Sequence, residues 1–91
     1  MSTKININRY FLKGLPNECS IVEVNGNTVS KCIQELTEKL PDIKNELFDS
    51  KGELLEWVCI FLNEKDTFPD ELDMPVKDGD EIDLIPLIGG G

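Results

Sequence analysis

The sequence contains no histidine, so it lacks the side chain that most often serves as a catalytic base and as a metal ligand. A serine or cysteine nucleophile activated by imidazole is therefore excluded. The chain has three cysteines and no Cys-x-x-Cys pair, which disfavours a disulfide framework and a zinc site. An iron–sulfur cluster would need four thiolates. We predict that the protein is not an enzyme and that it binds no metal or cofactor of its own.

Basic residues are also scarce, and long apolar runs are missing. Nine Lys and Arg stand against 18 Asp and Glu, a net charge of −9 that repels phosphate backbones and anionic lipids. No apolar stretch approaches the roughly 20 residues of a membrane helix, and residues 1–4 lack the apolar segment of a signal peptide. We therefore expect a cytoplasmic protein with no nucleic acid partner and no membrane partner.

The acidic residues are unevenly spread. Half of them fall within residues 64–83, which predicts a negative field that attracts a basic protein surface. Plain solubility is the alternative explanation for these acidic residues.

The three cysteines are not predicted to act as nucleophiles. Cys32 and Cys59 are expected in the core, and Cys19 has no neighbouring cation that would activate its thiol.

The first half of the chain shows strand signals and then a helix signal. Residues 4–11 and 20–24 alternate apolar and polar side chains, which predicts two strands joined by a turn at residues 13–17. Thr28 follows an Asn-Gly-Asn break and is expected to cap a helix. Apolar side chains then recur at helical spacing, at Val29, Cys32, Ile33, Leu36 and Leu40. This stripe should pack on a sheet, and a further short turn or helix is expected over residues 43–48.

The second half of the chain predicts strands separated by turns. Residues 54–62 are rich in β-forming side chains, which predicts a central strand buried on both sides. A tight turn over residues 63–66 and an edge strand at residues 67–68 are expected to follow. An Asp-Gly-Asp turn at residues 78–80 then leads into a last strand over residues 82–88. We expect a solvated rim made of Asp78, Asp80, Glu81 and Asp83.

This order of elements predicts the fold class. Two strands, a helix long enough to cross one sheet face and further strands are typical of an α+β fold with a mixed sheet, the β-grasp or ubiquitin-like layout. We expect one β-grasp domain over residues 1–88, because 91 residues support a single core. Residues 89–91 are expected to form a flexible tail.

The tail consists of Gly89, Gly90 and Gly91, directly after the apolar last strand. Glycine has no Cβ, so it is favoured where a backbone passes through a narrow channel or approaches a nucleotide closely. The terminal carboxylate is therefore the predicted reactive group, unless the glycines are a cloning scar.

The end of the chain also carries a motif. The segments Val76-Lys77-Asp78-Gly79-Asp80-Glu81-Ile82 and Pro86-Leu87-Ile88-Gly89-Gly90-Gly91 resemble the ThiS/MoaD family of ubiquitin-like sulfur carriers. The usual ending of that family is an Asp-Gly-Asp turn, a strand and Pro-x-x-x-Gly-Gly. Counted from Pro86, Gly90 and Gly91 match the terminal pair, whereas Gly89 replaces the Ala or Ser that is more often found there.

The resemblance implies a cycle carried by the tail. An adenylating, E1-like activating enzyme would use ATP to adenylate the Gly91 carboxylate, sulfur would displace AMP, and the resulting thiocarboxylate would donate sulfide to an acceptor enzyme. Gly89 would help the tail to thread into the partner. Some relatives carry extra C-terminal residues that a metalloprotease trims, and in that case the reactive carboxylate would belong to Gly90.

The last strand contains two alternating sets of apolar side chains. If one set enters the core, the other faces outward beside the tail. We predict that partners dock on this segment, at Ile85, Pro86, Leu87 and Ile88, with burial of the strand on both faces as the alternative. Pro86 has no amide hydrogen, so the sheet ladder should weaken there.

The destination of the sulfur has several candidates. Residues 49–56 and 62–66 look most like the carriers of cysteine or homocysteine (methionine) biosynthesis, whose acceptor is a PLP-dependent sulfhydrylase. The molybdopterin synthase small subunit, which serves the large subunit of that enzyme, and the thiamin sulfur carrier are alternatives. In a second class of function, the activated Gly91 would be conjugated to lysines, as in ubiquitin-like protein modifiers. In a third class, the chain would be a passive β-grasp interaction module.

Overall fold

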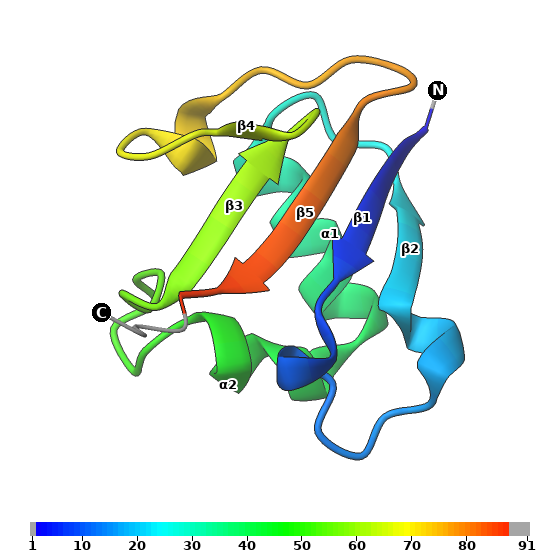
Figure 1. The fold of residues 1–91 in the computed structure, drawn as a ribbon, viewed down its shortest axis with the longest axis vertical. Helices are drawn as coiled ribbons and strands as arrows, with labels where there is room; N and C mark the ends of the chain where they lie inside the picture. The colour runs from blue at the N-terminus through cyan, green and yellow to red at the C-terminus, as the bar shows by residue number, and fades with distance from the viewer. Residues whose placement is uncertain (1, 88–91) are drawn as a thin grey trace.

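Two layers make up the structure, a mixed β-sheet and the helices that cover one of its faces (Figure 1). The computed structural model describes residues 2–87, apart from the side chains of residues 17 and 18. The strands are β1 (Thr3–Ile7), β2 (Ile21–Val24), β3 (Val58–Leu62), β4 (Lys65–Asp66) and β5 (Glu81–Pro86). The helices are α1 (Val29–Lys39) and α2 (Lys44–Leu47), with short 3-10 helices at Arg9–Phe11, Asn17–Ser20, Pro41–Ile43 and Glu71–Asp73.

The order of the strands is β2-β1-β5-β3-β4, so the last strand of the chain lies at the centre of the sheet. β5 runs parallel to β1 and antiparallel to β3, while β2 and β4 form the two antiparallel edges. A mixed sheet crossed by one main helix confirms the predicted α+β, β-grasp fold. β1 pairs with β5 as far as Leu84, and β3 pairs with it on the other side as far as Pro86.

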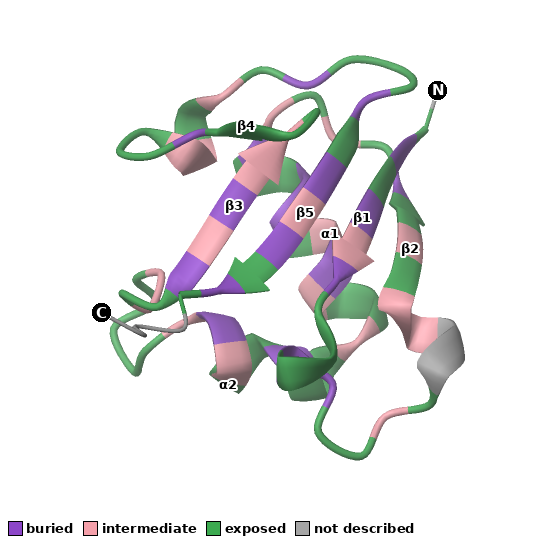
Figure 2. Cartoon of the chain, in the orientation of Figure 1, coloured by how far each residue is buried: buried purple, intermediate pink, exposed green. Residues whose placement is uncertain are grey.

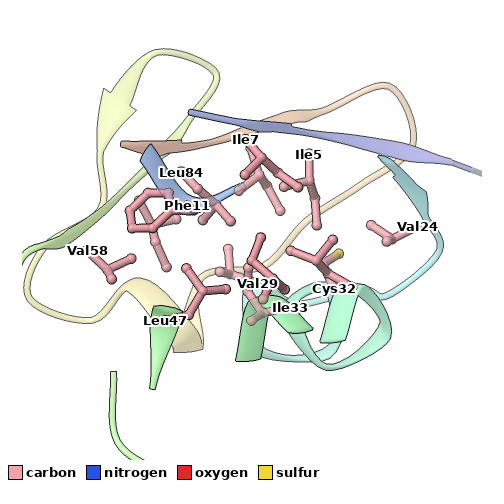
Figure 3. Close-up of a cluster of buried hydrophobic side chains, with 14 of the residues drawn as sticks. Ile5, Ile7, Phe11, Val24, Val29, Cys32, Ile33, Leu47, Val58 and Leu84 are labelled. Carbon is pink, nitrogen blue, oxygen red and sulfur yellow. The ribbon is translucent and has the colours of Figure 1, made fainter. Parts of the chain in front are cut away.

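The predicted helix is confirmed as α1. Thr28 Oγ1 accepts a hydrogen bond from the Lys31 amide at 3.2 Å, which caps the helix as expected. The predicted apolar stripe faces the sheet, with Val29, Cys32, Ile33 and Leu36 buried and Leu40 half-buried. Figure 3 shows Val29, Cys32 and Ile33 of this stripe facing side chains that point down from the strands. Full burial of one such side chain contributes roughly 1.5–3 kcal/mol, so this interface accounts for much of the stability.

The first strand is shorter than predicted. β1 ends at Ile7, and Asn8 Oδ1 accepts a hydrogen bond from the Tyr10 amide at 2.9 Å. This bond starts a 3-10 turn, which carries Phe11 under the sheet, where it is buried. The prediction of a strand up to residue 11 is wrong because a local side-chain bond bends the backbone after Ile7.

The predicted central strand over residues 54–62 is also wrong in length and place. β3 begins at Val58, because the Leu55 amide bonds to the Leu47 carbonyl at 2.8 Å and holds the preceding segment against α2. The strand lies second from the edge. Figure 2 shows buried and half-buried positions alternating along β3. Val58 and Ile60 are buried in the core, whereas Cys59 between them is half-buried and so lies on the opposite face. Cys59 is therefore not the core residue that we expected.

The hairpin after β3 differs from the prediction by two residues. Asn63 and Glu64 have φ angles of 51° and 69°, and Leu62 pairs with Lys65 directly across them. A two-residue loop with both φ angles positive returns the chain at once, because its twist matches that of the flanking strands. The edge strand is therefore Lys65–Asp66 rather than residues 67–68.

Candidate functional site

The Asp-Gly-Asp turn places the start of β5. The Gly79 amide donates to the Ser2 carbonyl at 2.9 Å, and Asp78 Oδ1 accepts from the Ser2 amide at 2.6 Å. Gly79 has a φ of +88°, a conformation that side chains with a Cβ rarely adopt. The motif thus joins the entry of β5 to the beginning of β1, which is its parallel neighbour in the sheet.

Asp80 forms the centre of this junction. Its Oδ1 accepts from Asn63 Nδ2 at 3.0 Å and its Oδ2 accepts from the Lys77 amide at 2.9 Å. Asn63 Oδ1 in turn accepts from the Glu81 amide at 3.0 Å. The hydrogen bond from Asn63, followed by that from Lys77, lowers the pKa of the Asp80 carboxyl below its ordinary value.

Asp80 corrects one of our expectations. It is buried, so it does not belong to the solvated rim, whereas Asp78 and Glu81 are exposed and Asp83 is half-buried. The role of Asn63 was missed in the sequence, where it stands in a turn with no sign of its contact 17 residues away. Together these residues anchor the strand that leads to the tail.

The side chains of β5 alternate between the two faces of the sheet. Ile82, Leu84 and Pro86 are buried against the helices. Ile85, and Leu87 directly after the strand, lie on the other face and are 37% and 62% exposed. The helices lie behind the sheet in the view of Figure 1, so this outer face is uncovered in the part of the chain that the structure describes. Of the predicted docking residues, the structure brings Ile85 and Leu87 to the surface and places Pro86 in the interior.

The ladder continues past Pro86, contrary to expectation. The Leu87 amide donates to the Trp57 carbonyl at 2.6 Å, although Pro86 itself has no hydrogen to donate. The backbone therefore stays paired with the segment before β3 up to Leu87. The remaining predicted residues, Ile88 for docking, Gly89 for threading, and Gly90 and Gly91 for sulfur loading, lie outside the described residues.

Several apolar side chains extend this outer face onto β3. Cys59 lies directly opposite Ile85, Phe61 lies opposite Asp83, and both are half-buried. Trp57, whose carbonyl holds the Leu87 amide, is 44% exposed. The sequence did not identify these residues as surface residues, because the strand is apolar at almost every position. Alternation, the usual signal of a one-sided strand, is therefore hidden.

Other kinds of site find little support. Among the side chains that the structure describes, no group of three His, Cys, Asp or Glu could hold a metal ion. No helix within the described residues is long and apolar enough to cross a membrane. Burial and the neighbouring carboxylates, mainly Glu35 for Cys32 and Asp66 for Cys59, raise the pKa of both thiols. A depression on the helix side, lined among others by Gln34, Phe48 and Leu72, is open to solvent and lies away from the outer face of β5.

Comparison with known proteins agrees with this geometry. The model of the ThiS family matches residues 6–91. The sulfur carrier protein CysO of Mycobacterium tuberculosis is 32% identical over 73 residues, which cover 77% of this chain and 78% of CysO. A chain in the crystal structure of the Amycolatopsis orientalis BexX/CysO complex aligns with a TM-score of 0.77 and 26% identity, covering 98% of this chain and 99% of the other.

A further solved structure shows the same fold at lower identity. SAMP1 from Haloferax volcanii aligns over 100% of both chains with a TM-score of 0.84 and 21% identity. A structural similarity at this sequence identity shows a common fold and nothing more. The match to the ThiS family model, in contrast, is a match of sequence that covers residues 6–91 and therefore includes the last glycine. On that match, and on the identity to CysO, the chain belongs to the ThiS family.

Proposed function

We propose that this chain is a sulfur carrier protein and that its C-terminal carboxylate, on Gly91, is the group that carries the sulfur. The observation that carries the proposal is the ThiS family match, which runs to residue 91 and so includes the terminal glycines. The similarity to CysO, which is named a sulfur carrier protein, supports it. So does the outer face of β5, whose exposed Ile85 and Leu87 stand directly before the tail.

The chemistry requires an activating partner. A carboxylate is a poor electrophile, so a Gly91 oxygen first bonds to the α-phosphorus of ATP and pyrophosphate leaves. A sulfur nucleophile then attacks the carbonyl carbon and AMP leaves, which yields a thiocarboxylate. In this scheme the partner binds ATP and performs the catalysis, while the chain supplies the reacting group and a docking surface. The glycines suit this task because a tail without side chains can reach deep into the partner's site.

We assign the sulfur to cysteine or homocysteine synthesis, through a PLP-dependent sulfhydrylase, on the basis of the likeness to CysO. A complex of a CysO chain with another protein, BexX, supports the idea that such carriers deliver to a bound acceptor. The molybdopterin and thiamin pathways use the same thiocarboxylate chemistry and stay as alternative destinations. Conjugation of the activated Gly91 to lysine amines would start from the same adenylate.

The test uses the full chain, a cognate E1-like adenylating enzyme, ATP and sulfide. We expect intact-mass analysis to show one terminal oxygen replaced by sulfur, and no change when ATP is omitted. A terminal group that never changes would overturn the proposal. Labelled sulfur should then pass to a product of the sulfhydrylase, whereas transfer through a molybdopterin synthase large subunit, or lysine-linked adducts in cells, would favour an alternative.

A further inference from the structure

The outer face of the sheet contains one polar pair between its apolar side chains. Asn6 on β1 and Asp83 on β5 are direct neighbours in the parallel register, and Asn6 Nδ2 donates to Asp83 Oδ1 at 2.8 Å. Both side chains are half-buried. The bond fixes the orientation of the carboxylate and occupies one of its two oxygens, so the second oxygen keeps its capacity to accept.

Asp83 has no cationic partner within the described chain. Among the described side chains the ion pairs are Lys13–Glu46 and Lys39–Glu35, and neither involves a strand residue. The alternation of the strands puts the charged side chains Glu23, Asp66, Glu81, Asp83 and Lys4 on the outer face. A single lysine against four acids leaves this face negative, in line with the net charge of −9. It is therefore complementary to a basic surface.

A shallow depression lies beside the pair. It is lined by Asn6, Ile7, Asn8, Asp83, Leu84 and Ile85. It exists because β1 ends at Ile7 while β5 continues, and the last backbone bond between them runs from the Asn8 amide to the Leu84 carbonyl at 3.0 Å. Past that bond, one flank of Ile85 is free of a neighbouring strand. The depression thus combines an apolar wall with a carboxylate at one end.

This shape fits the side chain of a lysine or an arginine. The aliphatic stem of such a side chain packs on an apolar surface while its charged head binds a carboxylate. We propose that the activating enzyme inserts a basic side chain into this depression, with the stem on Ile85 and the cation on Asp83, which Asn6 positions. The inference rests on the proposed function, because it describes how the enzyme that adenylates Gly91 would recognise the docking surface of the carrier.

The test measures pyrophosphate release by the adenylating enzyme as a function of the concentration of the full-length carrier. Asp83→Asn keeps the shape and can still accept from Asn6, but it removes the charge. We expect KM for the carrier to rise about tenfold while kcat is unchanged, because the interaction forms on docking and not in the chemical step. The matched control Glu38→Gln removes an exposed charge on α1 and should leave KM unchanged.

Two further measurements separate recognition from folding. Raising the ionic strength should increase KM for the wild-type carrier more steeply than for Asp83→Asn, because the variant has lost a screened attraction. Asn6→Ala keeps the charge but loses its positioning, so KM should rise by a smaller factor, about threefold, with kcat again unchanged. Thermal melting confirms that each variant is folded.

The outcomes distinguish the inference from the function on which it rests. If the wild-type chain is adenylated but Asp83→Asn behaves like Glu38→Gln, the basic side chain is not recognised here and the inference is wrong, while the proposed function stands. If kcat falls and KM does not, the pair acts on the chemical step and the inference is again wrong. If the wild-type chain is never adenylated, both proposals fail.

Discussion

At the scale of single residues, Asp80 stands out among the described acidic side chains because it is the one that is buried. Its carboxylate joins the β3–β4 hairpin, through Asn63, to the turn at Lys77, and Asn63 in turn holds the first amide of β5. The strand that presents the docking residues is therefore aligned by one buried charge and one amide side chain. Buried acceptors of this kind are costly to leave without donors.

Asp80→Asn is expected to destabilise the fold. The carboxylate accepts from two donors, Asn63 Nδ2 and the Lys77 amide. An asparagine side chain would face one of these donors with its own NH₂ group, so one of the two hydrogen bonds is lost. We therefore expect the free energy of unfolding to fall by about 1–3 kcal/mol. Urea denaturation at neutral pH measures this change. The control Asp42→Asn, at an exposed position, should change stability by no more than about 0.5 kcal/mol. Equal losses in both variants would contradict the assigned role.

The same carboxylate predicts a dependence on pH. The pKa of Asp80 is lowered in the folded state from its ordinary value of 3.8, so its stabilisation is present above that value and is lost as the pH falls through the folded pKa. We expect the difference in stability between wild type and Asp80→Asn to shrink at acidic pH. Denaturation at a series of pH values from neutral to strongly acidic tests this, and a constant difference would refute it.

At the scale of elements, the turn into β5 depends on the backbone of Gly79. Its φ of +88° is unfavourable for other residues, and no atom lies within 4 Å of the position that a Cβ would take. Gly79→Ala should therefore destabilise by backbone strain alone, about 1–2 kcal/mol. Gly79→Asn should lose less, because asparagine tolerates positive φ. A larger loss for asparagine than for alanine in thermal melting would contradict this explanation.

The outer face of β5 predicts a separation between stability and recognition. Ile85 and Leu87 are exposed, so the double variant Ile85→Ser with Leu87→Ser should unfold within about 1 kcal/mol of the wild type. Its KM in the adenylation assay should rise about tenfold or more, because the apolar contact with the partner is lost. Ile21→Ser is the control, since Ile21 is 56% exposed on the same face but lies on the far edge strand. If this control raises KM as much, the docking surface is not centred on β5.

The elements differ in how well the sequence predicted them. The spacing from Val29 to Leu40 and the cap at Thr28 predicted α1 closely, because a helix depends on neighbours within a few residues. β3 was predicted poorly, because residues 57–62 are apolar throughout. Such a run fits a strand that is buried on both faces and equally a strand with one apolar face exposed to solvent. The loop bonds of Asn8 and Leu55 that shorten two strands also leave no periodic signal.

At the scale of the whole molecule, the domain and the tail should be separable. In the part of the chain that the structure describes, the buried core extends from Ile5 to Leu84, and we expect Gly89, Gly90 and Gly91 to add nothing to it. Deleting Gly90 and Gly91 should therefore leave the melting temperature unchanged and abolish adenylation, because the reacting carboxylate moves back along the chain. Adding one alanine after Gly91 is a matched control for the position of the carboxylate and should also block sulfur loading. A truncated chain that still accepts sulfur would contradict the assignment.

Patterns within a few residues were enough to predict the class of fold, the main helix and the last strand of this chain. They were enough because helix caps, side-chain alternation and turn glycines act locally. The burial of Asp80, the open apolar face and the Asn6–Asp83 pair come instead from contacts between distant segments, and the last of these joins residues 77 positions apart. Such contacts exist only after β1 and β5 have paired, since that pairing sets the register and with it the face on which each side chain lies.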